Sequence, residues 1–311
     1  TEVPELLEEV MQIHSCDSYG SSLWSKPAKI STTLADGEPK LFFLKCIEGP
    51  DGRAMLEGEF KSMRALYRVA PENFVPWPYA WGKLASGPEK YFYLSEFIEM
   101  DKRKPDPDQL CEKLYQMHKE SQSQSRAFGF DINTWRGKLP QNLKRNRSWE
   151  KFYVQLLEGV KEQLESVKEQ HRMKNSTSEK LEKIVDHLIA HVVKKVLGPL
   201  HTEVHNIKPT LIHGYLWDQN VGVESRTGNV FIFDASSFYA HYEMEIALWR
   251  SEMNKFLSME VYKRKYLERM RISHPRNQFE DRMKIYSCYL ALHQFVCRDA
   301  KYLIEEYGFP S

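Results

Sequence analysis

The chain has 311 residues, of which 41% are hydrophobic and 13% aromatic, enough to form a large core in one or two domains. Its 44 basic and 43 acidic side chains leave a net charge of +1, which argues against a nucleic acid or a membrane surface as a partner. Five cysteines without a CxxC pair argue against a disulfide framework, and no apolar run is long enough to cross a membrane. We therefore expect a reduced, cytoplasmic setting.

The first segments of the chain predict a helix and then a turn. Residues 1–14 carry apolar side chains at helical spacing, which predicts a short amphipathic helix. The polar segment that follows contains one glycine, Gly20. A turn that faces phosphate is conceivable there, but the pattern alone favours an ordinary turn.

Two β-rich segments follow, at residues 29–34 and 40–47. The Asp36-Gly37 pair between them is a strong hairpin signal. Lys45 lies among apolar neighbours in the second segment, where a lysine is usually an edge or snorkelling residue. If Lys45 is buried, it requires an anionic partner.

A candidate partner for this lysine lies on the next element. Residues 52–69 have the apolar spacing of a helix, and Glu59 on this helix is placed to face Lys45. The Pro- and Trp-rich segment 75–82 is predicted to be extended, and a strand is predicted up to Ile98. Charge and proline then break the pattern, which predicts a β-rich domain at 1–100 and a helical domain at 101–311.

Helical patterns dominate the second domain. Their apolar residues recur every three or four positions, whereas residues 128–142 are irregular. The predicted helices cover residues 106–121, 148–167, 181–197, 245–257, 260–271 and 277–308.

Polar side chains cluster around two short predicted strands at residues 210–212 and 229–233. They are His213, Asp218, Asn220 and Asp234. Polar groups at strand ends beside a tight loop usually belong to a site, because rigid strands position such loops. Alternatively, these side chains only satisfy the backbone of the loop.

The order of these features is that of a known architecture. It resembles the two-lobed protein kinase fold and, more closely, the fructosamine-3-kinase (ketosamine kinase) family. The matching segments are FLKC, AMLEGEF, FGF followed by GKLPQN, HGYLWDQN, and FDASSFYAHYEMEIALWR. The resemblance implies an α+β fold, with a small N-terminal β-sheet lobe that carries one main helix and a larger, mostly helical C-terminal lobe.

The resemblance also implies roles for individual residues on the nucleotide side. Lys45, paired with Glu59, would hold the α- and β-phosphates of ATP, and Asn220 and Asp234 would hold Mg²⁺. The segment from Glu96 to Ile98 would form the adenine-binding hinge. The loop at Gly20–Ser22 would cover the phosphates.

On the acceptor side, the family pattern is only partly kept. Phe238, Tyr239, His241 and Glu243 would border the acceptor, although a purely structural role for this run is equally compatible with the sequence.

The departure from the family pattern lies in the loop that begins at His213. The family reads HGDLW, whereas this chain reads HGYLW, so Tyr215 stands where the catalytic aspartate is expected. A phenol, with a reference pKa of about 10, is a poor general base near neutral pH. Asp218 is a candidate substitute, but relatives with an intact aspartate also carry an acid there, so it does not read as compensation.

Three hypotheses follow. In the one that the sequence favours, the cleft binds a small organic substrate and converts it without phosphorylation and without a required cofactor, for example as a cyclase, isomerase or pericyclase. Tyr215 would then donate a hydrogen bond or shape the pocket. In the second, the chain is an ATP- and Mg²⁺-dependent small-molecule or ketoamine kinase. In the third, it is a non-catalytic pseudokinase.

Overall fold

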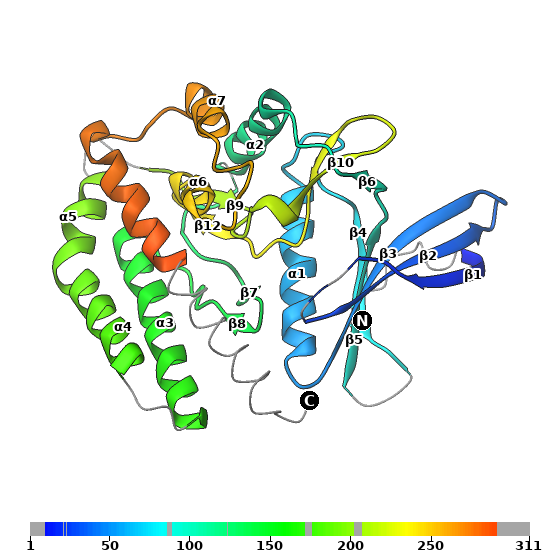
Figure 1. Cartoon of the computed structure of the whole chain (residues 1–311), viewed down its shortest axis with the longest axis horizontal. Helices are drawn as coiled ribbons and strands as arrows, with labels where there is room; N and C mark the ends of the chain where they lie inside the picture. The colour runs from blue at the N-terminus through cyan, green and yellow to red at the C-terminus, as the bar shows by residue number, and fades with distance from the viewer. Residues whose placement is uncertain are drawn as a thin grey trace.

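The computed structural model describes residues 10–290, except for residues 21, 23, 86–88, 123, 172–175 and 202–206. Figure 1 shows two lobes, a sheet with one long helix against it and a larger mass of helices. The predicted α+β, two-lobed architecture is thus confirmed.

The N-terminal lobe is built on a five-stranded antiparallel sheet in the order β1-β2-β3-β5-β4. The predicted hairpin joins β2 to β3, and Gly37 adopts the positive φ of +88° that this turn requires. The strands are β1 Val10–Ser18, β2 Lys26–Leu34, β3 Pro39–Glu48, β4 Pro78–Lys83 and β5 Lys90–Glu96.

The helix predicted for residues 1–14 is wrong where the structure describes it. Residues 10–14 belong to β1, which pairs antiparallel with β2. Met11 and Ile13 are 74% and 64% exposed, so their apolar spacing does not mark a buried helix face. Pairing with the open edge of β2 outweighs the local preference. Residues 1–9 lie outside the described residues.

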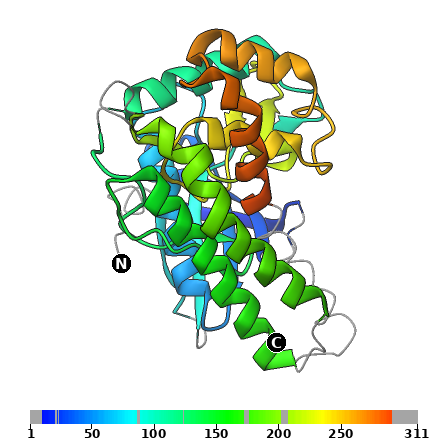
Figure 2. The same ribbon diagram turned by 90° about the vertical axis from the view of Figure 1, so that its left-hand side faces the viewer.

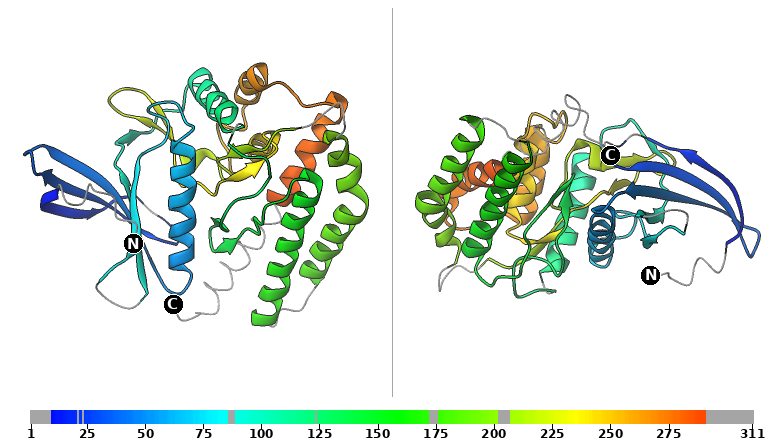
Figure 3. Two further views of the ribbon diagram at one scale, coloured as in Figure 1. Left: turned by 180° about the vertical axis from the view of Figure 1, so that it is seen from behind. Right: turned by 90° about the horizontal axis from the view of Figure 1, so that it is seen from below.

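Helix α1, Gly52–Tyr67, packs against the sheet and separates it from the helical lobe, as Figure 3 shows from behind. Its apolar face is buried as predicted, with Leu56, Phe60 and Leu66 at most 1% exposed. On its other side Gly58 approaches the second lobe so closely that a Cβ would lie 3.2 Å from Asn133 O. Even a Cβ here would require the backbone near Asn133 to shift by a few tenths of an ångström.

The C-terminal lobe contains the remaining helices, and Figure 2 shows α3 beside the α4–α5 segment. The predicted helices within the described residues are confirmed, with two differences. The helix at 181–197 contains a π-helical turn at Leu188–Val192. The one predicted at 245–257 is a shorter helical segment that begins at residue 243 and ends at residue 250. The helices are α2 Pro107–Ser121, α3 Trp149–His171, α4 Ser176–His187, α5 Val193–Leu197, α6 Glu243–Ala247, α7 Glu260–Met270 and residues 279–290.

Short strands lie where the two lobes meet and carry the polar residues singled out above. Strand β9, Thr210–Ile212, pairs with β12, Phe238–Ala240. The other short strands are β6 Met100–Asp101, β7 Trp135–Arg136, β8 Leu139–Pro140, β10 Val221–Glu224 and β11 Val230–Ile232.

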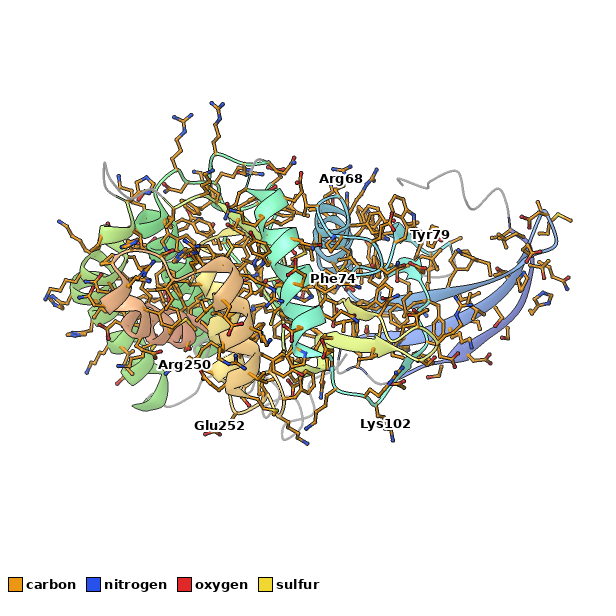
Figure 4. The ribbon with its side chains drawn as sticks, turned by 90° about the horizontal axis from the view of Figure 1, so that it is seen from above. Arg68, Phe74, Tyr79, Lys102, Arg250 and Glu252 are labelled. Carbon is orange, nitrogen blue, oxygen red and sulfur yellow. The ribbon has the colours of Figure 1, made fainter. Side chains whose placement is uncertain are left out.

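The connection between the lobes is well packed. Phe74, fully buried, lies between α1 and α2 in Figure 4, and its carbonyl accepts a hydrogen bond from Ile232 N at 2.9 Å. Strand β6 spans the predicted domain boundary and pairs with β10. The division at residue 100 itself stays a prediction.

Candidate functional site

The centre of the site is an ion cluster of Lys45, Glu59 and Asp234, which we call the interlobe cluster. Lys45 lies in β3, Glu59 in α1 and Asp234 just after β11. The ammonium of Lys45 lies 2.7 and 2.9 Å from the two oxygens of Glu59 and 2.5 Å from Asp234 Oδ1. The side chains of Lys45 and Glu59 are 11% and 13% exposed, whereas that of Asp234 is 46% exposed. The cluster is therefore open to solvent on the side of Asp234.

One cation between two carboxylates leaves the cluster unbalanced. Burial lowers the pKa of Lys45, but Asp234 and Glu59 outweigh burial, so the pKa of the ammonium is raised. For Glu59, burial and the charge of Asp234 outweigh Lys45 and raise the pKa to about 7. Burial also acts to raise the pKa of Asp234, but Lys45 reverses this and lowers it. Near neutral pH, Lys45 thus faces one firm anion and one carboxyl group that titrates.

Asn220 lies next to this cluster. Its amide nitrogen Nδ2 donates to Tyr215 O at 2.8 Å and to Asp234 O at 3.3 Å. In the part of the chain that the structure describes, its oxygen Oδ1 accepts no hydrogen bond. Asp234 has a φ of +62°, a left-handed conformation that aspartate tolerates better than most residues.

His213 shapes the loop after β9 rather than facing solvent. It is fully buried; its Nε2 lies 3.0 Å from Phe233 O and its Nδ1 accepts from Tyr215 N at 3.3 Å. Burial lowers the pKa of the imidazole, so the ring stays neutral. Both ring nitrogens are occupied by backbone groups.

Glu245 fixes the backbone of the same loop. Its carboxylate accepts from His213 N at 2.5 Å and from Gly214 N at 3.2 Å. Gly214 has a φ of +76°, and a Cβ there would lie 2.2 Å from Ser236 O. Position 214 therefore accepts only glycine.

Tyr215, at the position of the expected catalytic aspartate, packs against aromatic and cationic neighbours. The guanidinium of the buried Arg136 lies 5.1 Å from the centre of its ring, and the ring of Trp217 lies 5.9 Å away. Arg136 also donates to Gly214 O at 2.7 Å. A cation over an aromatic face stabilises the stack, so this chain holds Tyr215 in a defined position.

Asp218 holds a neighbouring loop. Its Oδ2 accepts from the backbone of Lys255 and, at 3.0 Å, from that of Phe256; its Oδ1 accepts from Leu257 N at 3.1 Å. Its own N–H donates to Asn254 Oδ1 at 3.0 Å. A carboxylate with three backbone donors is a poor candidate for a substitute base.

Two described aromatic residues of the connection between β1 and β2, Tyr19 and Trp24, contact other elements. Tyr19 contacts the ring of Phe97 at 4.8 Å between centroids, directly after Glu96. Trp24 receives the ammonium of Lys138 at 5.4 Å from its ring centre. Gly20 has a φ of +79° and open space around it, while Ser21 lies outside the described residues. A phosphate-covering role for Gly20–Ser22 stays a prediction.

The predicted hinge lies at the end of β5, which stops at Glu96 rather than at Ile98. Glu96 N donates to Trp77 O at 2.8 Å, and Trp77 N donates back to Glu96 Oε2 at 3.2 Å. Ile98 follows in irregular backbone and is half-buried. An adenine-binding role for this segment stays a prediction.

The aromatic run after β11 builds the scaffold. Phe238 and Tyr239 are buried, and His241 contacts Tyr286 Oη and Ser273 Oγ, each at 2.8 Å. Glu243 is fully buried against Arg282, with oxygen–nitrogen distances of 2.7 and 3.0 Å. Of the two alternatives left open by the sequence, these contacts favour the structural one.

Two residues that contact the site escaped the sequence analysis, namely Arg136 and Glu245. Arg136 lies in a segment that reads as irregular, because β7 is only two residues long. Glu245 belongs to the HYEME segment that carried the family resemblance, and the signal that could have found it is an acid buried in a very apolar run.

The donor set fits a nucleotide with a divalent cation. Lys45 supplies an ammonium for phosphate oxygens, Asp234 a partly exposed carboxylate, and Asn220 an amide oxygen without a hydrogen-bond donor in the described region. Hard oxygen ligands of this kind are those that Mg²⁺ prefers.

Among the residues that the structure describes, no helix is long and apolar enough to span a bilayer.

Comparisons with known proteins indicate the family of this chain. Residues 24–307 match the fructosamine kinase family model. Over 209 residues the chain is 29% identical to the chloroplastic protein-ribulosamine 3-kinase of Oryza sativa subsp. japonica, a match that covers 67% of this chain and 55% of the rice protein. It is 32% identical to mouse ketosamine-3-kinase over 121 residues, covering 39% of this chain and 34% of that protein. The chain thus matches about half of the length of the rice protein.

Solved structures share the fold. A provisionally assigned fructosamine-3-kinase of Haemophilus somnus superposes with a TM-score of 0.70 at 21% identity, covering 99% of this chain and 90% of that one. The aminoglycoside phosphotransferase APH(4)-Ia, in a complex with AMP-PNP and hygromycin B, gives a TM-score of 0.60 at 15% identity, covering 96% and 91%. The family model spans nearly all of this sequence, and the chain therefore belongs to the fructosamine kinase family.

Proposed function

We propose that this chain binds ATP–Mg²⁺ between its lobes and transfers phosphate, without a carboxylate base, to a hydroxyl group of a small ketoamine-like acceptor. The interlobe cluster carries this proposal, because it buries a lysine between two carboxylates and leaves one of them partly exposed. Charges buried in this way are costly unless they are used or fully paired. A cleft that no longer met nucleotide would have little reason to keep them.

Each residue has a defined task in this proposal. Lys45, oriented by Glu59, binds phosphate oxygens, while Asp234 and the amide oxygen of Asn220 hold the cation. Bound ATP–Mg²⁺ supplies the phosphoryl group and neutralises its charge. Glu245 and Gly214 keep the loop in place, so that the acceptor hydroxyl meets a fixed surface at Tyr215.

The proton of the acceptor has no carboxylate to receive it. Tyr215 is a phenol, and the oxygens of Asp218 are occupied by the backbone of residues 255–257. The proton then leaves to water or with the transferred phosphoryl group. Because phosphoryl transfer depends mainly on positioning and metal electrostatics, the reaction persists, but the missing base slows it by roughly 10²–10⁴-fold.

The experiment is to introduce the missing base. Tyr215→Asp should raise ADP release on a panel of ribulosamines and fructosamines by about 10²-fold or more, while Tyr215→Phe serves as the control that keeps the ring. ATP–Mg²⁺ should raise the melting temperature of all three proteins. No nucleotide binding would overturn the proposal. Binding without turnover in either the wild type or Tyr215→Asp would identify a pseudokinase instead.

A second candidate function rests on the stack of Tyr215 and Arg136. A phenol held by a guanidinium is suited to donate a hydrogen bond to a substrate oxygen that gains negative charge. The cleft would then convert a small organic substrate by cyclisation or isomerisation, with no cofactor. Turnover without ATP that Tyr215→Phe abolishes would favour this candidate, whereas turnover that depends strictly on ATP would exclude it.

A further inference from the structure

A groove in the helical lobe lies apart from the interlobe cluster and contains none of the candidate site residues discussed above. It has a volume of about 610 Å³ and is open to solvent. Its walls are the C-terminal halves of α2 and α7, which lie side by side at the top of Figure 1, together with residues 207–208 and 271–274. Its volume is in the range of small-molecule sites, about 300–1,000 Å³.

The charges that line this helical-lobe groove are of one sign. Among the residues that the structure describes, this wall contains no carboxylate, although the whole chain is nearly neutral, with a net charge of +1. Basic side chains that outnumber the acids beside them create a positive potential, which a concave, low-dielectric wall strengthens. The cationic side chains are Lys119, Lys208, Arg269 and Arg271, and His274 adds an imidazole to the wall.

Helix ends explain only part of this set. Lys119 and Arg269 lie in the last turns of α2 and α7, where cations complement the helix dipole. Arg269 also pairs with Glu112 at 2.6 Å and with Asp108 at 3.2 Å, so its charge is already balanced by acids. Lys208 and Arg271 lie outside both helices, and neither forms an ion pair with any residue that the structure describes.

Arg271 is presented from a fixed backbone. It has a φ of +57°, which a non-glycine residue adopts only where its surroundings hold it. Its N–H donates to Leu267 O at 3.0 Å, and its carbonyl accepts from Tyr242 Oη at 2.8 Å. Tyr242 Oη also lies 2.6 Å from Ser273 Oγ, so the floor of the groove is tied together by hydrogen bonds.

We propose that the helical-lobe groove binds a small polyanion, a molecule with two or more phosphate or carboxylate groups. Arg271 and Lys208 supply charge that no described acid neutralises, and Arg269 is pre-oriented by Glu112. Tyr115 and Met270 give the groove an apolar surface for the carbon skeleton, and Gln122 adds a neutral donor. A planar guanidinium on a fixed base suits either kind of anionic group.

The test uses two probes, pyrophosphate and citrate, in calorimetric titrations of the full chain. The Lys45→Met variant serves as the background, because it removes the phosphate-binding lysine of the other site. At least one probe should bind at one site per chain, and its affinity should fall with added salt.

The double variant Arg271→Ala/Lys208→Ala should weaken binding at least tenfold. The matched control Lys26→Ala/Lys83→Ala, which removes two exposed lysines of the sheet lobe, should leave it unchanged. Binding of pyrophosphate alone assigns the groove to phosphates, and binding of citrate alone assigns it to carboxylates. The proposal is overturned if neither probe binds, or if the groove variant binds as tightly as its parent.

Discussion

Two ion clusters in this molecule differ in the balance of their charges and in their access to solvent. In the interlobe cluster, Lys45 faces two carboxylates, and Asp234 is 46% exposed. In the helical lobe, Glu243 and Arg282 form a bidentate pair in which both side chains are 0% exposed. Arg282 also donates to the carbonyls of Ser273 and Pro275, at 2.9 and 2.8 Å, and Glu243 accepts from Ser273 N at 2.8 Å.

The difference shows which of the two clusters can take a ligand. The Glu243–Arg282 pair has its charges matched and its hydrogen bonds satisfied, so a ligand would gain nothing there. The interlobe cluster has an unmatched carboxylate and a path to solvent, so a phosphate or a cation can join it without first breaking the fold. Burial alone does not mark a site; unmatched charge with access does.

The strongest way to break this comparison is to remove Arg282. Arg282→Ala leaves Glu243 buried without its partner and should lower the free energy of unfolding by about 3–5 kcal/mol. Urea denaturation of the variant measures this. The double variant Glu243→Met/Arg282→Met should recover most of the loss, and a double variant as unstable as the single one would show that the pair contributes more than charge balance.

Lys45→Met should affect ligand binding far more than stability. Glu59 has a raised pKa and can take up a proton once its partner is gone, so the free energy of unfolding should change by less than about 2 kcal/mol. The stabilisation by ATP–Mg²⁺, about 2.7 kcal/mol at a hundredfold excess over Kd, should disappear. Lys26→Met, at an ion pair whose lysine side chain is 81% exposed, is the control that should keep it.

The interlobe cluster should also make stability depend on pH. The folded pKa of Glu59, about 7, is above its ordinary value of 4.5, so the folded chain holds this proton more tightly than the unfolded chain. Its contribution to stability is complete below about pH 4.5 and is lost as the pH rises through 7. Melting temperatures of the wild type should therefore fall relative to Glu59→Gln over this range. If the melting temperatures of the two proteins changed with pH in parallel, the raised pKa of Glu59 would be contradicted. The lowered pKa of Asp234 acts at more acidic pH, where its contribution is lost as the pH falls.

The smallest effect is expected at an exposed pair. Arg250, labelled on the helical lobe in Figure 4, lies 2.8 Å from Glu280, with side chains 38% and 55% exposed. Solvent screens this pair, so Arg250→Ala should change the free energy of unfolding by less than about 1 kcal/mol. A loss comparable to that of Arg282→Ala would mean that distance, rather than burial, governs these ion pairs.

Much of the N-terminal lobe could be predicted because its signals are local. The Asp36-Gly37 turn, the apolar strand around Lys45 and the helical face around Glu59 each depend on a few neighbouring residues, and the two charged side chains do meet. Strand β1 could not be predicted, because its conformation comes from pairing with β2 and not from its own spacing.

The loop that contains Tyr215 and Asp218 was less predictable, because its contacts join distant parts of the sequence. Arg136 meets Tyr215 across 79 positions, and Asp218 meets the backbone of residues 255–257 almost 40 positions later. Periodicity carries no information about such pairs. The substitution at Tyr215 itself was visible in the sequence, but the guanidinium that holds it was not.

Gly214 and Glu245 have a consequence for how new chemistry arises in this fold. Since they hold the backbone of residues 213 and 214, the neighbouring side chain at position 215 can be exchanged while these contacts stay in place. The same property makes position 215 a natural starting point for saturation mutagenesis, with the architecture already supplied by its neighbours.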